Sequence, residues 1–138
     1  MVRVMDSDRT RWLGIVLIAL TGLLHLVEAP EYLGEERYIG ALFLASAVGS
    51  AIALYGIWRD QVWGWLLGIA VAGGAFVGYV LSRTVGLPRF REASWSQFLE
   101  PMGLLSLLVE GLFVVLALRV LTSTPEPERE RRVVSSPR

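Results

Sequence analysis

The chain has 138 residues, a formal net charge of zero, a hydrophobic content of 54% and a mean hydropathy of +0.52. This composition is too apolar for an ordinary soluble domain. Every basic residue is an arginine, and the absence of cysteine excludes disulfides, thiolate metal sites and a cysteine nucleophile. Charged residues gather at the two ends and in short gaps, and each intervening apolar stretch approaches the roughly 20 residues that cross a bilayer. The chain is therefore expected to be an integral membrane protein.

The first expected helix runs from about Trp12 to Ala29, after a short polar lead in which Asp8 or Thr10 can cap its start. No small-residue cleavage site follows this apolar stretch, so we expect a retained span rather than a cleaved signal peptide. Pro30 disfavours helical geometry at Ala29 and removes a backbone donor. The helix is therefore expected to kink or end there.

Three further spans are predicted from stretches that are nearly free of charge, at residues 38–58, 62–82 and 101–121. Residues 59–61 are expected to form a tight turn, and Pro101 suits the first turn of the last helix. From residue 122 to 138 the chain is rich in proline, glutamate and arginine, and we expect disorder. Short connections make neighbouring helices antiparallel. Residues 1–121 are therefore predicted to form one all-α, four-helix transmembrane bundle.

The arginines predict how the bundle is oriented. Nine of the 13 basic residues fall on the side that carries both termini, and four fall on the other side. Because arginine is enriched in cytoplasmic loops, both termini are expected in the cytoplasm, with the protein in the cell inner (plasma) membrane.

Small residues recur every four positions on two of the spans. They are Ala45 and Gly49 on the second span and Ala70, Gly74 and Gly78 on the third. This spacing lets two helix backbones approach closely in lipid. We expect these residues to pack helices together rather than to surround a ligand.

A few ionisable residues lie in or beside the apolar stretches. His25 is the only histidine, and Glu28 follows it by three residues on the same helix face, with Glu31 shortly after. Arg83 directly follows the third span, where it can meet an acidic partner, and Glu110 lies in the middle of the fourth. Such residues are costly in a membrane and are functional candidates by default. All five are therefore candidate ligand or relay residues.

Two interpretations of these residues remain open. In the first they form a buried clasp, with His25 against Glu110 and Arg83 against an acid, which holds the helices in register. In the second they form a site that opens to the outer half of the membrane. A metal site would have to use His25, Glu28 and Glu110, which are fewer ligands than zinc or iron sites usually have. No cofactor is indicated. Ser106, one turn before Glu110, is expected to bond its own backbone.

The segments HLVEAPEYL and GALFLASA, the turn SRTVGLP and the last helix beginning EPMGLLSLLVE resemble a group of small bacterial four-span membrane proteins of unknown function. The resemblance spans roughly residues 20–118. It implies the same topology and points to His25, Pro30, Glu31, the turn 82–88 and Glu110. It implies no activity.

The function expected from the sequence is binding or relay of a small species at this polar cluster. The species would be a proton, a metal ion or a lipophilic molecule such as a quinone. The alternative is a structural or assembly subunit of a larger membrane complex, and a membrane oxidoreductase subunit comes third. An enzyme is not favoured, because no phosphate-binding loop or serine elbow occurs. The expected partners are the lipid bilayer and further membrane subunits, either copies of this chain or a larger complex; nucleic acid has no support.

Overall fold

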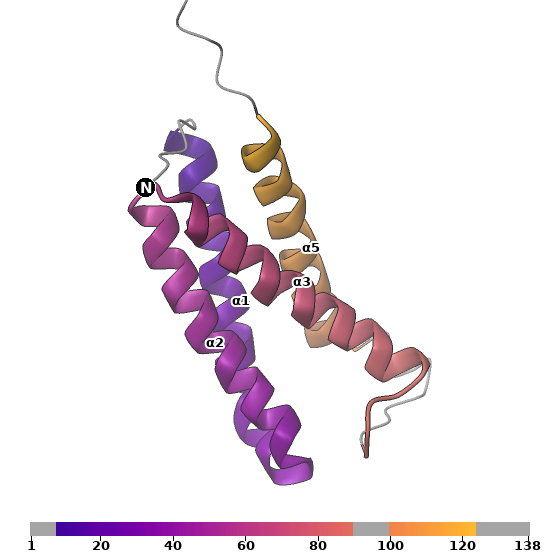
Figure 1. Ribbon diagram of the computed structural model, residues 1–138. Helices are drawn as coiled ribbons and strands as arrows, with labels where there is room; N and C mark the ends of the chain where they lie inside the picture. The colour runs from indigo at the N-terminus through magenta and orange to yellow at the C-terminus, as the bar shows by residue number, and fades with distance from the viewer. Residues whose placement is uncertain (1–7, 90–99, 124–138) are drawn as a thin grey trace, which may run out of the picture.

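The computed structural model describes residues 8–89 and 100–123. This part of the chain forms four long helices and confirms the predicted all-α four-helix bundle (Figure 1). The helices are α1 (Asp8–Glu35), α2 (Arg37–Trp58), α3 (Val62–Thr84) and α5 (Pro101–Thr122). Of the tail predicted to be disordered, residues 122–138, Thr122 is the last residue of α5, and the residues beyond Ser123 lie outside the described residues.

The outer surface of the bundle is apolar. Large hydrophobic side chains are more than half exposed on every helix, for example Leu23, Val48, Val77 and Leu108. All four helices are long and apolar enough to cross a bilayer. A continuous apolar surface of this kind is unfavourable in water and is satisfied by lipid. The four helices thus fit an integral membrane protein.

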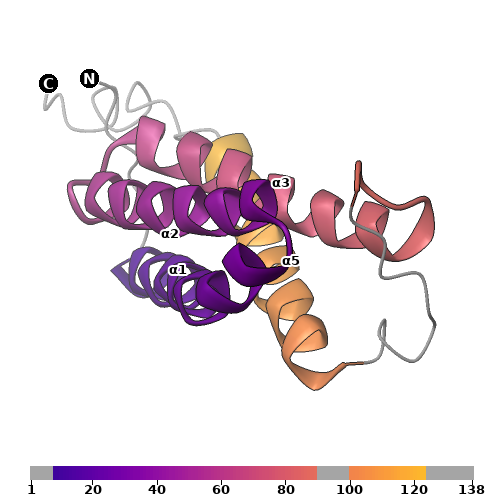
Figure 2. The same ribbon diagram turned by 90° about the horizontal axis from the view of Figure 1, so that it is seen from below.

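The helices pack in a ring in which α1 contacts α2, α2 contacts α3, α3 contacts α5 and α5 contacts α1. Figure 1 shows α1 and α2 side by side along their lengths, while α3 crosses them at an angle. Seen from below in Figure 2, the second half of α3 and the first half of α5 diverge from α1 and α2. The bundle therefore has a closed half, near the α2–α3 turn, and an open half at the other end.

Tight packing defines the closed half. Trp65 of α3 stacks on Phe113 of α5 with ring centroids 6.1 Å apart, and both rings are almost completely buried. A Cβ added to Gly64 would lie 2.5 Å from the backbone of Gly56 and Ile57, so α2 and α3 touch here through their backbones. The buried apolar cluster lies around these contacts. It consists of Ile15, Leu17, Ile18, Ala53, Ile57, Trp65, Ala72, Val109, Phe113, Ala117 and Val120.

The turn between α2 and α3 is as tight as predicted. Asp60 adopts a left-handed conformation with φ 55°, which aspartate tolerates better than most residues. The amide of Asp60 donates to the Ile57 carbonyl and the amide of Gln61 to the Gly56 carbonyl, both at 2.9 Å. This hydrogen-bond pattern satisfies the last carbonyls of α2 and reverses the chain.

The first helix does not end at Pro30. It continues to Glu35, and the amide of Glu36 donates to the Tyr32 carbonyl at 2.9 Å. The expected end at Ala29 is therefore too early. Contacts with α2 hold the extra turns, because a Cβ at Gly40 would lie 2.5 Å from Leu33. Tertiary packing of this kind outweighs the loss of one backbone hydrogen bond at a proline.

Candidate functional site

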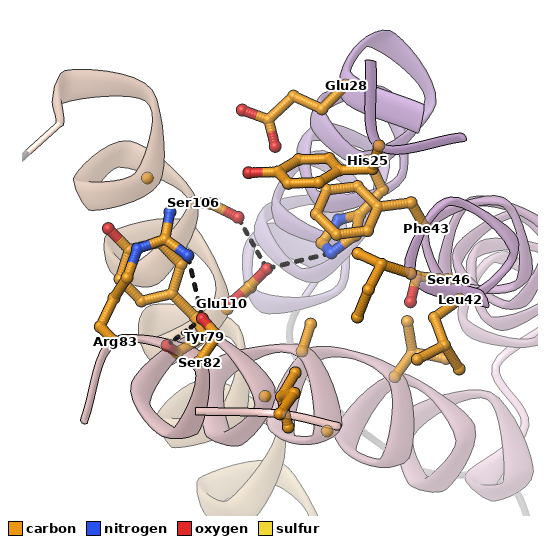
Figure 3. Close-up of a pocket in the computed structure, with 18 of the residues that line it drawn as sticks. His25, Glu28, Leu42, Phe43, Ser46, Tyr79, Ser82, Arg83, Ser106 and Glu110 are labelled. Carbon is orange, nitrogen blue, oxygen red and sulfur yellow. Dashed lines mark hydrogen bonds and ion pairs between the residues drawn. The ribbon is translucent and has the colours of Figure 1, made fainter. Parts of the chain in front are cut away.

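The open half of the bundle contains a cavity of about 330 Å³, shown in Figure 3. Side chains from all four helices surround it, together with one residue from the loop after α3 and the residue that precedes α5. The lining residues are His25, Glu28, Tyr32, Ile39, Leu42, Phe43, Ser46, Ala70, Val71, Gly74, Ala75, Gly78, Tyr79, Ser82, Arg83, Leu87, Glu100, Gly103, Ser106 and Glu110.

The small residues of α3 make room for this cavity. A Cβ added to Gly74 or Gly78 would have no neighbour within 4 Å, and both glycines line the cavity with Ala70. By contrast, a Cβ at Gly49 of α2 would lie 2.7 Å from Val71. The prediction that small residues pack the helices holds for Gly49 but is wrong for Gly74 and Gly78, whose missing side chains leave space.

His25 and Glu110 meet where the cavity reaches the centre of the bundle. His25 Nε2 lies 3.6 Å from Glu110 Oε1, and the two residues are only 6% and 1% exposed. The other ring nitrogen, Nδ1, lies 2.8 Å from the carbonyl oxygen of Thr21. Because a carbonyl only accepts, Nδ1 carries a proton and Nε2 faces the carboxyl group. The pair can therefore hold one proton, either on Glu110 or on Nε2.

Ser106 is the third member of this cluster. Its hydroxyl donates to Glu110 Oε1 at 2.7 Å, one helical turn away on α5. The expectation that Ser106 bonds its own backbone is wrong. A nearby carboxyl group accepts the hydroxyl proton instead, and this bond orients Glu110 toward α1 (Figure 3).

Arg83 lies in the last turn of α3 and is largely buried. Its Nη1 donates to the Ser82 hydroxyl at 2.9 Å, and its guanidinium carbon lies 4.4 Å from the centre of the Tyr79 ring. A cation is favoured both over the face of a tyrosine and at the C-terminal end of a helix. These contacts hold the Arg83 charge on the α3 wall of the cavity.

Aromatic rings from α1 and α2 form another wall. The Tyr32 and Phe43 ring centroids are 4.4 Å apart, and those of His25 and Phe43 are 4.9 Å apart. Tyr32 lies seven residues after His25, so the two rings share one face of α1. This wall depends on the helical turns that follow Pro30, because Tyr32 lies beyond Ala29, the expected end of the helix.

Four of the five candidate residues, namely His25, Glu28, Arg83 and Glu110, line the cavity. Glu31 is exposed and is not among the lining residues. Since α1 remains helical past Pro30, the positions three and seven residues after His25 face the cavity, while the position six residues after it turns away.

The geometry of the described residues does not support the metal site considered from the sequence. Within residues 8–89 and 100–123, no three histidine, cysteine, aspartate or glutamate side chains are grouped so that they could hold a metal ion. His25, Glu28 and Glu110 are thus not supported as a metal-ligand set.

The loop after α3 connects α3 to the start of α2 at the open end of the bundle. Gly86, with φ 84°, donates its amide to the Leu81 carbonyl and ends the helix. Farther on, the Tyr38 hydroxyl of α2 donates to the Pro88 carbonyl, and Arg89 lies 3.6 Å from Glu36. The loop is thereby attached to the start of α2, beside the cavity that its Leu87 helps to line.

Comparison with known protein families, curated proteins and solved structures found no match to this chain. We therefore infer function from the geometry of the cavity.

Proposed function

We propose that this protein binds a small, partly apolar molecule in the cavity of its open half. The observation that carries the proposal is a space of about 330 Å³ onto which two buried ionisable side chains, His25 and Glu110, face. Ligand sites in proteins are mostly apolar pockets of roughly 300–1,000 Å³ with a few placed polar groups. The cavity has this size and this composition.

The cost of the polar groups supports a binding role. A glutamate in the middle of a membrane helix is expensive, even with partners. Two glycines that leave open space next to it give up helix propensity and van der Waals contacts as well. A protein that needed only a firm bundle would fill this space with side chains.

A second candidate function is that of a structural subunit of a larger membrane complex. The observation that favours it is the His25–Glu110 contact, which links α1 to α5 and is the geometry of an internal clasp. The two functions make different demands. A clasp requires the contact but no empty volume, whereas a binding site requires both.

We further propose that the protein lies in the plasma membrane with both termini in the cytoplasm. The excess of arginine on the side of the termini supports this orientation. The open half of the bundle then faces the outer half of the membrane, so ligands would enter from the outside or from the outer leaflet.

The binding function is tested by filling the cavity. Gly78→Leu places a side chain in open space on the cavity wall, and Gly34→Leu adds the same group at another open position, on α1 outside the cavity. The probes are three small benzene derivatives of different charge, benzyltrimethylammonium, N,N-dimethylbenzamide and phenylacetate. Binding is measured on protein in lipid nanodiscs against empty nanodiscs.

We expect saturable binding of at least one probe by the wild-type protein. Gly78→Leu should weaken that binding at least tenfold, and Gly34→Leu should leave it unchanged. The proposal is overturned if no probe binds saturably, or if Gly78→Leu binds as well as the wild type does.

A further inference from the structure

The charges around the cavity favour one class of ligand. Three carboxyl groups line it, those of Glu28, Glu100 and Glu110, against the guanidinium of Arg83 and the imidazole of His25. When the His25–Glu110 pair holds its proton and is neutral, two carboxylates remain against one guanidinium, which leaves one negative charge. Electrostatic interactions are stronger in a low-dielectric site than in water. An organic cation is therefore favoured over a neutral or anionic molecule of the same shape.

Arg83 lies apart from the α1 wall of the cavity. Its guanidinium group is oriented by Ser82 and by the ring of Tyr79. Figure 3 shows it across the cavity from His25 and Glu28. The α1 side of the cavity thus remains acidic, with Glu28 on its lining.

The aromatic wall is suited to the same class of ligand. The faces of tyrosine and phenylalanine attract cations, most strongly when the pair is shielded from water. Tyr32 and Phe43 line the cavity beside His25, and the Arg83–Tyr79 contact shows that a tyrosine of this cavity already accepts a cation on its face. Carboxylates and aromatic faces together are the chemistry that recognises organic ammonium groups.

We propose that the cavity binds a small lipophilic monocation, of the amine or quaternary ammonium class, with the Glu110 carboxylate as its counter-ion. Binding of the cation displaces the proton that the His25–Glu110 pair holds in the empty site. One cation enters, one proton leaves, and the net charge of the site stays the same. This proposal rests on the proposed binding function and specifies its ligand.

The exchange predicts how affinity depends on pH. The titratable and charged groups that face Glu110 across the cavity are His25, Glu28 and Tyr32 of α1, Tyr79 and Arg83 of α3, and Glu100 before α5, while the α2 lining has no such group. Loss of the proton from the pair creates the counter-ion. The affinity should therefore rise with pH by up to tenfold per unit and level off once the pair has lost its proton.

The test measures benzyltrimethylammonium binding to the full chain in nanodiscs across a range of pH. This probe has no proton to lose, so any proton that is released comes from the protein. Glu110→Gln removes the counter-ion and keeps the side-chain shape. The matched control is Glu31→Gln, an acidic residue of α1 that lies outside the cavity. We expect Glu110→Gln to weaken binding at least tenfold and to abolish the pH dependence, and Glu31→Gln to change neither.

The outcomes separate this proposal from the one on which it rests. Equal or tighter binding of N,N-dimethylbenzamide or phenylacetate overturns the cation proposal but leaves a binding cavity. A wild-type affinity for the cation that does not change with pH overturns the exchange, whether or not Glu110→Gln folds. The absence of saturable binding for all three probes overturns both proposals.

Discussion

At the scale of single residues, local hydrogen bonds fix the directions of the side chains that meet at Glu110. The Thr21 hydroxyl donates to the Leu17 carbonyl, and the Thr21 carbonyl in turn accepts from His25 Nδ1. Ser106 donates to the Glu110 carboxyl group from the other side. In lipid an unpaired polar group costs several kcal/mol. The local helix backbone therefore orients His25, and a neighbouring hydroxyl orients Glu110, so that the two point at each other.

This geometry predicts that Glu110→Gln will fold almost as stably as the wild type. Glutamine can still accept from Ser106, and its amide can donate to His25 Nε2. Intramembrane side-chain hydrogen bonds contribute only about 0.6 kcal/mol on average. The free energy of unfolding in detergent should therefore change by less than about 1 kcal/mol. A loss of several kcal/mol would instead indicate an ion pair whose surviving charge is left unpaired.

At the scale of the helix, the two halves of α3 differ in how closely they pack against their neighbours. Its first half packs closely, with Gly64 against the α2 backbone and Gly68 against the Phe113 ring. Its second half moves away from α2 and lines the cavity with Gly74 and Gly78. The same residue type thus allows close contact at one end of a helix and leaves a hollow at the other.

Alanine substitution should distinguish the two halves. A Cβ at Gly64 would lie 2.5 Å from backbone atoms of α2, so Gly64→Ala forces the helices apart and should destabilise the protein by about 1–3 kcal/mol. Gly74→Ala meets open space and should stabilise the helix by up to about 1 kcal/mol. Thermal unfolding in detergent measures both. Equal effects at the two positions would refute the division of α3 into two halves.

At the scale of the whole molecule, the sequence allowed the four helices to be predicted because each apolar stretch is bounded by charges. It did not allow the end of α1 to be predicted, because the turns after Pro30 depend on contacts with α2 at Gly40 and Phe43. The spacing of Gly74 and Gly78 permits close packing but does not show whether a neighbour is present. The pairing of His25 with Glu110 was one of two anticipated arrangements, while the aromatic wall depends on the unexpected length of α1.

Cysteine labelling tests the proposed orientation, since the wild-type chain has no cysteine to remove. Glu35→Cys marks the exposed end of α1, and Ser123→Cys marks the residue after α5 at the other end of the bundle. In intact cells, a membrane-impermeant maleimide should label Glu35→Cys, whereas Ser123→Cys should be labelled only after the membrane is opened. The reverse pattern would contradict the orientation inferred from the arginines.

Both proposals require that the open half of the bundle contains an accessible cavity next to a closed core. Ser46 and Ser50 lie one turn apart on α2; Ser46 lines the cavity, while Ser50 is buried outside its lining and only 1% exposed. The most direct measurement is the rate at which a water-soluble cationic methanethiosulfonate modifies Ser46→Cys and Ser50→Cys in nanodiscs. We expect Ser46→Cys to react at least tenfold faster and to be protected by benzyltrimethylammonium. Equal, slow modification at both positions would contradict the cavity.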